Sequence, residues 1–280
     1  MALTIAVTGA TGAQGSGLVR AILADAGREF SVRAITRDIS SVRARKLAEL
    51  GAEVVSADHT TGAGLEEAFA DVHGAFLVTD FWSHMSAARE PDQARNLAEA
   101  TAKAGVRHVI WSTLEDTRIH VPVDDPRMPS LQEKYKIPHF DAKAEAEAFF
   151  HQAGVPVTFL RTTFQFENLT AGMAPVRTPE GLILTMPIGD SPIAGIAASD
   201  SGKVALEIFR RRDEFVGRTL SIAGDIVTGA EIASALSDAL HEPVVYRPIG
   251  HDDFRALGFP AADEVGNMLG TAPGLVDSQG

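Results

Sequence analysis

The chain contains no cysteine, no long apolar run and fewer basic than acidic residues. The lack of cysteine excludes disulfides, thiol catalysis and cysteine-ligated zinc or iron–sulfur sites. With 25 Lys and Arg against 37 Asp and Glu, the net charge is −12, which disfavours direct nucleic-acid binding because that needs basic surface. No stretch approaches the roughly 20 apolar residues of a membrane span, and no basic segment typical of a signal peptide opens the chain. We therefore expect a soluble, cytoplasmic protein.

Short apolar runs alternate with helical patterns over the first 160 residues. The runs are Leu3–Thr8, Ser31–Ile35, Ala52–Ser56, Gly74–Thr79, His108–Ser112 and Pro156–Leu160. This alternation predicts βαβ units and a parallel sheet, because strands buried on both faces are continuously apolar. We predict a doubly wound α/β fold of the Rossmann type over 1–160, with helices on both faces and later segments interwoven. Residues 161–280 are predicted to form a smaller α/β lobe.

A glycine-rich turn follows the first strand, where residues 8–15 read TGATGAQG. Gly9, Gly12 and Gly15 form a variant of the dinucleotide-binding motif. One glycine allows the sharp turn, one lets the backbone approach a pyrophosphate, and one lets the next helix pack on the sheet. The helix N-terminus then offers N–H groups and the positive end of its dipole to the phosphates. The alternative is a glycine-rich turn that binds nothing.

The end of the second strand bears on the choice of dinucleotide. The sequence there is Thr36-Arg37-Asp38, and an NAD site usually has Asp or Glu at this point. Between residues 31 and 50 the charged residues are Arg33, Arg37, Arg43, Arg45 and Lys46 against Asp38 and Glu49, which gives 5 − 2 = +3. A local cationic patch suits a 2′-phosphate, which a guanidinium binds bidentately, so we predict NADP(H). In the alternative, Asp38 bonds the ribose 2′-OH and the basic residues form a solvated helix face.

Several further segments, taken with the glycine turn, resemble one family. They are Gly51–Val55 (GAEVV), Val78–Trp82 (VTDFW), His139–Lys143 (HFDAK), Gly154–Pro156 (GVP), Phe166–Leu169 (FENL) and Leu257–Pro260 (LGFP). In order and spacing they are similar to the NmrA-like atypical short-chain dehydrogenases, particularly the animal redox-sensor proteins of that family. The segment between Leu114 and His139 is longer and richer in proline than in the animal proteins.

The resemblance implies an NADP-binding Rossmann domain and a small lobe for a substrate or partner. The residues that it assigns to the cofactor are Gly9, Thr11, Gly12, Gln14 and Gly15 for the phosphates, Arg37 for the 2′-phosphate, Asp58 for the adenine, Thr79 for the ribose, and Lys143 and Asn168 for the nicotinamide end. Ordinary short-chain dehydrogenases use a Tyr and a Lys four residues later. Here that spacing reads His139-x-x-x-Lys143, and Tyr135 lies at the wrong offset.

His139, Lys143 and Ser112 are the catalytic candidates, and three interpretations of them remain open. Lys143 binds the nicotinamide ribose of a redox sensor that has no turnover, or the site passes hydride directly to a quinone-like acceptor, or His139 is a general acid. The structural alternatives are a solvated or capping His139, a Lys143 paired with Glu147 at i+4, and a Ser112 hydroxyl that bonds backbone groups.

The expected function is that of a regulatory, redox-sensing NADP(H)-binding protein, with an NADPH-dependent reductase of a small electron-poor compound as the alternative. Phe81, Trp82 and Phe166 line a substrate pocket or simply pack the core. No histidine spacing suggests a metal site. The partner is a small-molecule substrate or a regulatory protein, a homodimer is left open, and the segment 114–139 is either a lid or a surface insertion.

Overall fold

A computed structural model describes residues 2–270, so the last ten residues of the expected lobe 161–280 lie outside the described part. The chain divides into two compact units. Unit 1 comprises residues 2–116, Ala142–Thr162 and Ala198–Ile222, and unit 2 comprises Thr117–Asp141, Thr163–Ala197 and 223–270. The expected boundary after residue 160 lies close to the limit at Thr162. The later segment Ala198–Ile222 belongs to unit 1, and residues 117–139 of the segment 114–139 belong to unit 2.

Unit 1 is built on one seven-stranded sheet in the order β11-β6-β5-β4-β1-β2-β3, in which every neighbouring pair is parallel. The strands are β1 (Leu3–Val7), β2 (Phe30–Thr36), β3 (Glu53–Ser56), β4 (Gly74–Leu77), β5 (His108–Thr113), β6 (Val157–Thr162) and β11 (Thr219–Ile222). This is the doubly wound Rossmann order with one further strand, and it reverses between β1 and β4. Ligands of such sheets bind at the carboxyl ends of the strands near that point.

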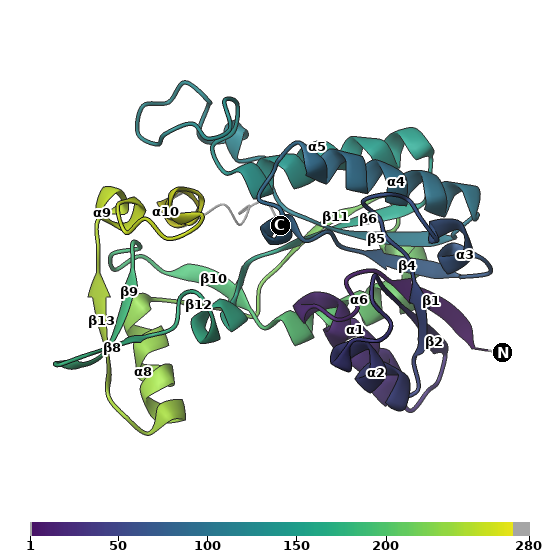
Figure 1. Ribbon diagram of the computed structural model, residues 1–280, viewed down its shortest axis with the longest axis horizontal. Coiled ribbons are helices and arrows are strands. Elements are labelled where there is room, and N and C mark those ends of the chain that lie inside the picture. Colours follow the sequence, from purple (N-terminus) through teal and green to yellow (C-terminus); the bar gives the residue numbers. More distant parts are fainter. Residues whose placement is uncertain (1, 271–280) are drawn as a thin grey trace. The chain divides into compact units, whose positions relative to one another are not determined.

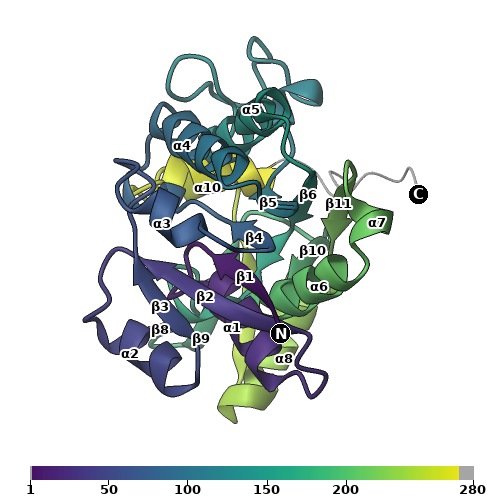
Figure 2. The ribbon, with the colours of Figure 1, turned by 90° about the vertical axis from the view of Figure 1, so that its right-hand side faces the viewer.

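Helices cover both faces of the unit 1 sheet (Figures 1 and 2). They are α1 (Ala13–Ala24), α2 (Val42–Glu49), α3 (Leu65–Phe69), α4 (Arg89–Lys103), α5 (Pro138–Ala153), α6 (Ala198–Arg210) and α7 (Arg212–Phe215), with a 3₁₀ turn η1 (Phe81–Ser83). Alternate residues of strands β1–β6 enter two separate cores. For example, Ile5 and Val7 pack with α1, α2 and α6, whereas Ala6 packs with α3, α4 and α5. This alternation explains why the strands read as continuous apolar runs.

Glycines let α1 and α6 approach closely in unit 1. A Cβ on Gly17 would lie 2.8 Å from the Cα of Ser199, and one on Gly202 would lie 2.2 Å from the backbone N of Leu18. Backbone therefore packs directly on backbone here, which no larger residue allows.

Unit 2 contains two small sheets, in the orders β12-β10-β7 and β13-β9-β8. Its strands are β7 (Phe164–Gln165), β8 (Val176–Thr178), β9 (Gly181–Met186), β10 (Ile193–Ile196), β12 (Asp225–Val227) and β13 (Val244–Pro248). Its helices are η2 (Thr117–Ile119), η3 (Phe166–Thr170), α8 (Gly229–Leu240), α9 (His251–Arg255) and α10 (Ala262–Gly270), and it includes the first residues of α5. A capping box of Thr228 and Glu231 begins α8, which satisfies N–H groups at both positions. Leu184, Met186 and Ile232 lie at the centre of its core.

Hydrogen bonds hold residues 117–139, which are most of the segment 114–139, within unit 2. The Lys136 side chain is buried, and its amine donates to the backbone oxygens of Asp125 and Met128 at 2.8 and 2.6 Å. The buried Asp141 carboxylate accepts hydrogen bonds from Thr117 and from the backbone of Lys136. Burial raises the pKa of Asp141 above its ordinary value although these bonds lower it. From α10, the Asn267 amide donates to the backbone oxygen of Lys136 at 2.7 Å.

No helix of residues 2–270 has the length and apolar character that a membrane crossing requires.

Candidate functional site

The glycine turn leads from β1 into α1 at the carboxyl edge of the unit 1 sheet. Gly9 has a φ of 57°, in the left-handed region that favours glycine. A Cβ on Gly15 would lie 2.3 Å from the backbone oxygen of Gly9, so only glycine lets α1 start this close to the turn. Gly12 differs, because its added Cβ would meet only that same oxygen, at 3.2 Å.

The N-terminus of α1 is open to an anion. Gly12 is its N-cap and provides no side-chain cap, and the first turn contains no acidic residue. The first N–H groups of a helix have no acceptor within the helix, and the dipole adds positive potential there. A phosphate is the kind of group that such a turn holds. The residues present thus fit the diphosphate of a dinucleotide.

Gln14 connects this turn to β5. Its Oε1 accepts a hydrogen bond of 2.8 Å from the Ser112 hydroxyl, and Ser112 lies near the end of β5. The predicted catalytic Ser112 therefore contacts a predicted phosphate-site residue, a pairing that the sequence did not indicate.

Arg37 and Asp38, which follow β2, differ in their contacts. Arg37 is exposed. Asp38 Oδ1 accepts hydrogen bonds from the Ser40 hydroxyl and backbone N–H at 2.5 and 2.8 Å, and these bonds lower the pKa of Asp38. The Asp38 backbone oxygen accepts from the hydroxyl of Ser41, which caps α2. Asp38 thus shapes the turn into α2.

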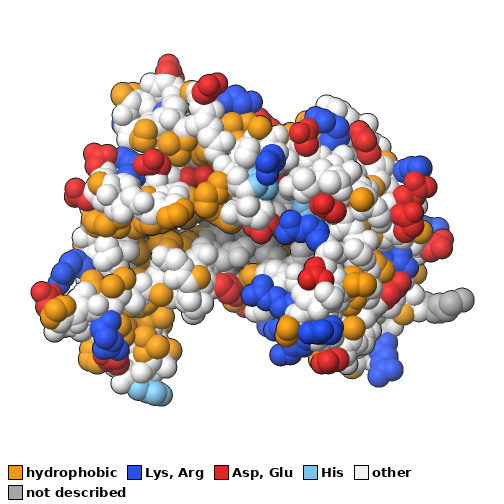
Figure 3. Space-filling model, in the orientation of Figure 1, with side chains coloured by type: hydrophobic (Ala, Val, Ile, Leu, Met, Phe, Trp, Pro, Cys, Tyr) orange, Lys and Arg blue, Asp and Glu red, His pale blue; other side chains and the backbone are white. Residues whose placement is uncertain are grey.

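Of the five basic residues expected to form a cationic patch within residues 31–50, one is taken up by contacts at the sheet edge. The Arg33 guanidinium bonds Glu53 at 2.9 Å and the backbone oxygen of Ala70 at 2.7 Å, so it stabilises the sheet edge. Arg37, Arg43, Arg45 and Lys46 remain exposed. In the face shown in Figure 3, basic side chains gather over α1 and α2.

Asp58 and His59 follow β3. Asp58 Oδ1 accepts the Thr60 N–H at 2.9 Å, and its backbone N–H donates to Ala63, so the residue is held in a tight turn. Burial raises the pKa of Asp58, but hydrogen bonds from Thr60 bring it below its ordinary value. Burial lowers the pKa of the neighbouring His59, which also senses Arg37 and Lys143 as positive charges and Asp58 and Glu90 as negative ones.

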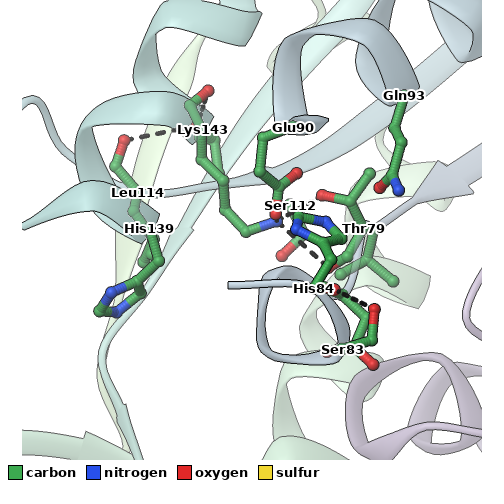
Figure 4. A network of polar contacts seen from close by, with 12 residues as sticks. Thr79, Ser83, His84, Glu90, Gln93, Ser112, Leu114, His139 and Lys143 are labelled. Atoms are coloured by element: carbon green, nitrogen blue, oxygen red, sulfur yellow. Dashed lines mark hydrogen bonds and ion pairs between the residues drawn. The ribbon is translucent and has the colours of Figure 1, made fainter. Parts of the chain in front are cut away.

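Lys143 lies buried on α5, beside Thr79 after β4. Its Nζ donates to Thr79 Oγ1 at 2.5 Å and to the Thr79 backbone oxygen at 3.2 Å. It also lies 3.4 Å from Glu90 Oε1 and 5.5 Å from the centre of the Trp111 ring. Figure 4 shows Lys143, Glu90 and Thr79 pointing toward one another. The sequence placed Lys143 and Thr79 in the site but did not identify Glu90.

The alternative of a solvated Lys143–Glu147 pair is wrong. Glu147 Oε1 instead accepts the Thr113 hydroxyl at 2.8 Å. Burial raises the pKa of Glu147 above its ordinary value. Lys143 is 8% exposed, so its amine lies in the interior of unit 1 and not at the surface.

His139 belongs to unit 2, where it is buried. Glu264 Oε1 lies 2.7 Å from His139 Nδ1 and accepts the His139 backbone N–H at 2.6 Å. His139 therefore joins the start of α5 to α10, 125 residues later in the chain. The alternative of a solvent-facing residue is wrong, and the general-acid role remains a prediction.

The remaining predicted residues divide between the units. In unit 1, Phe81 is buried and Trp82 is 43% exposed, with their rings in edge contact 5.5 Å apart. In unit 2, Asn168 is exposed on η3. The Phe166 ring lies on Gly195, whose Cβ would come within 2.2 Å of it. Among residues 2–270 no cluster of three His, Asp or Glu could hold a metal ion.

Comparison with known proteins agrees with this fold. The oxidoreductase FrzB of Cladobotryum sp., an NmrA-like family domain-containing protein, is 28% identical over 96% of this chain and 83% of its own. The negative transcriptional regulator NmrA, solved with NADP, has a TM-score of 0.76 at 22% identity and covers 96% of this chain and 81% of its own. Quinone oxidoreductase QOR2 of Escherichia coli, solved with NADPH, has a TM-score of 0.74 at 24% identity, with 95% and 87% covered. The NmrA-like family model matches residues 1–272, and the chain therefore belongs to the NmrA-like family.

Proposed function

We propose that unit 1 binds NADP(H). The observation that carries this proposal is the open N-terminus of α1, which the turn of Gly9, Gly12 and Gly15 starts at the carboxyl edge of the sheet and which no side chain caps. The Asp38 carboxylate is already hydrogen-bonded to Ser40, whereas the Arg37 side chain is exposed. This difference favours binding of a 2′-phosphate by Arg37 over binding of a 2′-hydroxyl by Asp38. NmrA has been solved with NADP and with NAD, and QOR2 with NADPH, so these neighbours support a dinucleotide site in unit 1.

Bound NADPH would supply a hydride, and this chain's residues would hold and orient it. Thr11 and Gln14 join the glycines around the diphosphate, Asp58 lies toward the adenine and Thr79 toward the ribose. Lys143 is assigned to the nicotinamide end, with Asn168 of unit 2 as a further candidate.

Isothermal calorimetry tests cofactor binding, with nucleotide-stripped protein titrated with NADPH, NADP⁺ and NADH. We expect the phosphorylated nucleotides to bind more tightly, and Arg37→Ala to lose about tenfold to a hundredfold in their affinity but little for NADH. Arg211→Ala is the matched control, because Arg211 is an exposed arginine that pairs with Glu214 before β11 begins. Equal affinity for NADH and NADPH would refute the 2′-phosphate assignment, and no binding would refute the whole proposal.

A regulatory redox sensor is the role that the site favours. Proton transfer in ordinary short-chain dehydrogenases needs a tyrosine, and the residue at that position here is His139, bonded to Glu264. A sensor must bind NADPH and NADP⁺ with unequal affinity, because a ligand shifts a conformational equilibrium only by its differential binding. The same titrations measure this ratio, and equal affinities would refute sensing. The partner would be a regulatory protein.

Direct hydride transfer to a small electron-poor compound is the second candidate. The names of curated relatives such as FrzB, an oxidoreductase, favour it. An electron-poor acceptor such as a quinone takes its proton from water, so no tyrosine is required. NADPH oxidation with a panel of quinones tests this role. Turnover in the wild type that is lost in Lys143→Ala would refute a sensor without turnover and support a reductase.

A further inference from the structure

Glu90 is a fully buried carboxylate in the first turn of α4. Its exposed fraction is 0%, and Lys143 Nζ lies 3.4 Å from its Oε1. Neither carboxylate oxygen accepts a hydrogen bond from any residue in the range 2–270. Buried charges are stable only when they are paired or hydrogen-bonded, and the charge partner that the structure gives to Glu90 is Lys143.

Lys143 depends on that partner in turn. Both Thr79 acceptors are neutral, so they orient the amine without balancing its charge. Removal from water disfavours an ammonium, whereas a carboxylate within about 4–6 Å favours it. Glu90 is therefore the group that opposes the effect of burial at Lys143.

His84 adds a donor to the same space. Its Nδ1 accepts the Ser86 N–H at 3.1 Å, so the proton of the neutral ring is on Nε2. That Nε2 is buried and has no hydrogen-bond partner in the described chain. Figure 4 shows the His84 ring pointing toward Glu90 and the Lys143 amine, and no hydrogen bond joins His84 Nε2 to Glu90. Besides these groups, the charges of Glu90 and Lys143 act on His59, which follows β3 and is also affected by Asp58 and Arg37.

We propose that Glu90 is a positioning residue, which holds Lys143 in its charged form and in its orientation beside Thr79. Its carboxylate acts through Lys143 and does not itself touch the cofactor. The proposal rests on the proposed function, since Lys143 matters to the nucleotide only if unit 1 binds one.

Carbon NMR of protein labelled at the lysine Cε tests the proposal in the absence of nucleotide. The chain has six lysines, and the resonance that disappears in Lys143→Arg identifies Lys143. Glu90→Gln keeps the shape of the side chain and removes its charge. We expect the midpoint of the Lys143 titration to move to lower pH by about one to three pH units.

Glu66→Gln is the matched control in the same spectrum. Glu66 pairs with Lys103 at 2.6 Å, but both side chains are exposed. The Lys103 midpoint should move by about 0.5 pH unit or less, and that of Lys143 not at all. An unchanged Lys143 midpoint in Glu90→Gln would overturn the proposal. If that variant fails to fold, Glu90→Asp provides a second test, because it keeps the charge but moves the carboxylate away from the Lys143 amine. It should lower the Lys143 midpoint by less than Glu90→Gln does. No drop in a folded Glu90→Asp would also overturn the proposal.

Nucleotide titration separates this proposal from the proposed function. Glu90→Gln should bind NADPH about tenfold or more weakly than the wild type, whereas Glu66→Gln should bind normally. If the wild type binds no nucleotide but Glu90→Gln shows the expected drop in the Lys143 midpoint, only the proposed function is refuted. If the wild type binds NADPH but the Lys143 midpoint is unchanged in Glu90→Gln, only the role of Glu90 is refuted.

Discussion

Adding one methyl group at Gly12 or at Gly15 should have different consequences, although both glycines lie in the same turn. At Gly15 the new Cβ would lie 2.3, 2.7 and 2.9 Å from three backbone atoms of Gly9 and Thr8. Backbone cannot rotate away as a side chain can, so α1 itself must shift. Overpacking of this kind costs about 3 kcal/mol, and the better helix propensity of alanine returns about 1 kcal/mol. The net loss is therefore about 2 kcal/mol.

At Gly12 the fold has room for a methyl group. Its φ of −86° and ψ of −179° suit any residue, and the 3.2 Å contact with the Gly9 oxygen needs only a small adjustment. The cost to stability should be about 1 kcal/mol or less, because alanine is a poorer N-cap than glycine. The same methyl group would project where a phosphate approaches the helix N-terminus. One misplaced carbon costs binding about tenfold to a hundredfold.

Thermal unfolding and calorimetry measure the two effects separately. We expect Gly15→Ala to lower Tm by about 4–8 °C. Gly12→Ala should lower Tm by less and still lose most of its NADPH affinity. Gly172→Ala is the control, since its added Cβ would meet nothing within 4 Å, and it should change neither quantity. A Gly12→Ala protein with wild-type affinity would refute the placement of the phosphates, and an unchanged Tm in Gly15→Ala would refute the packing argument.

Two further predictions concern stability. The Thr158 hydroxyl donates its proton to the backbone oxygen of Phe215, so the buried His108 must donate to Thr158 from Nε2. The proton of the neutral ring is therefore on Nε2, and Nδ1 carries no proton and has no hydrogen-bond partner among the described residues. Burial lowers the pKa of His108 to about 4; its contribution is therefore complete above pH 6.5 and is lost as pH falls toward 4, about 2 kcal/mol between pH 7 and pH 5. Urea unfolding at both pH values should show this loss in the wild type and much less of it in His108→Gln. In unit 2, Asn267→Ala would remove hydrogen bonds from the backbone oxygens of Pro129 and Lys136, of which the second bond is buried. It should therefore lower stability by about 2–3 kcal/mol and speed proteolysis within 117–137. Asn168→Ala, at an exposed asparagine, should do neither.

The sheet of unit 1 could be predicted because its physical causes are local. Six apolar runs correspond to β1–β6 within one or two residues at most ends, since burial on both faces leaves an unbroken apolar stretch. The glycine turn was identified for the same reason, because a left-handed turn and a close helix start require glycine at fixed positions. The short strands β7, β8, β10 and β12 lacked such a pattern, as two to four residues show no periodicity.

The charged interior could not be predicted, because its partners are distant in sequence. Glu90 lies just before Pro91 at the start of a helix, where acidic residues are usually solvated and stabilise the dipole. Nothing local distinguishes it from such a residue, and its partner Lys143 lies on α5, 53 residues later in the chain. Arg33 shows the reverse case, since it was counted with the nucleotide patch although Glu53 and the end of α3 bind it.

Helix α5 shows why the contacts of His139, at the position of the tyrosine in ordinary short-chain dehydrogenases, could not be read from the sequence. Both His139 and Lys143 lie on α5, where a spacing of i and i+4 places them on one helical face. Yet the first residues of the helix are bonded within unit 2, where Glu264 binds His139, and the later ones within unit 1, where Thr79 and Glu90 bind Lys143. A His139→Ala variant thus loses the buried hydrogen bond between the His139 ring and Glu264 in unit 2, whatever the chemical role of His139. Its loss of activity would indicate proton transfer only if the stability of unit 2 remained unchanged.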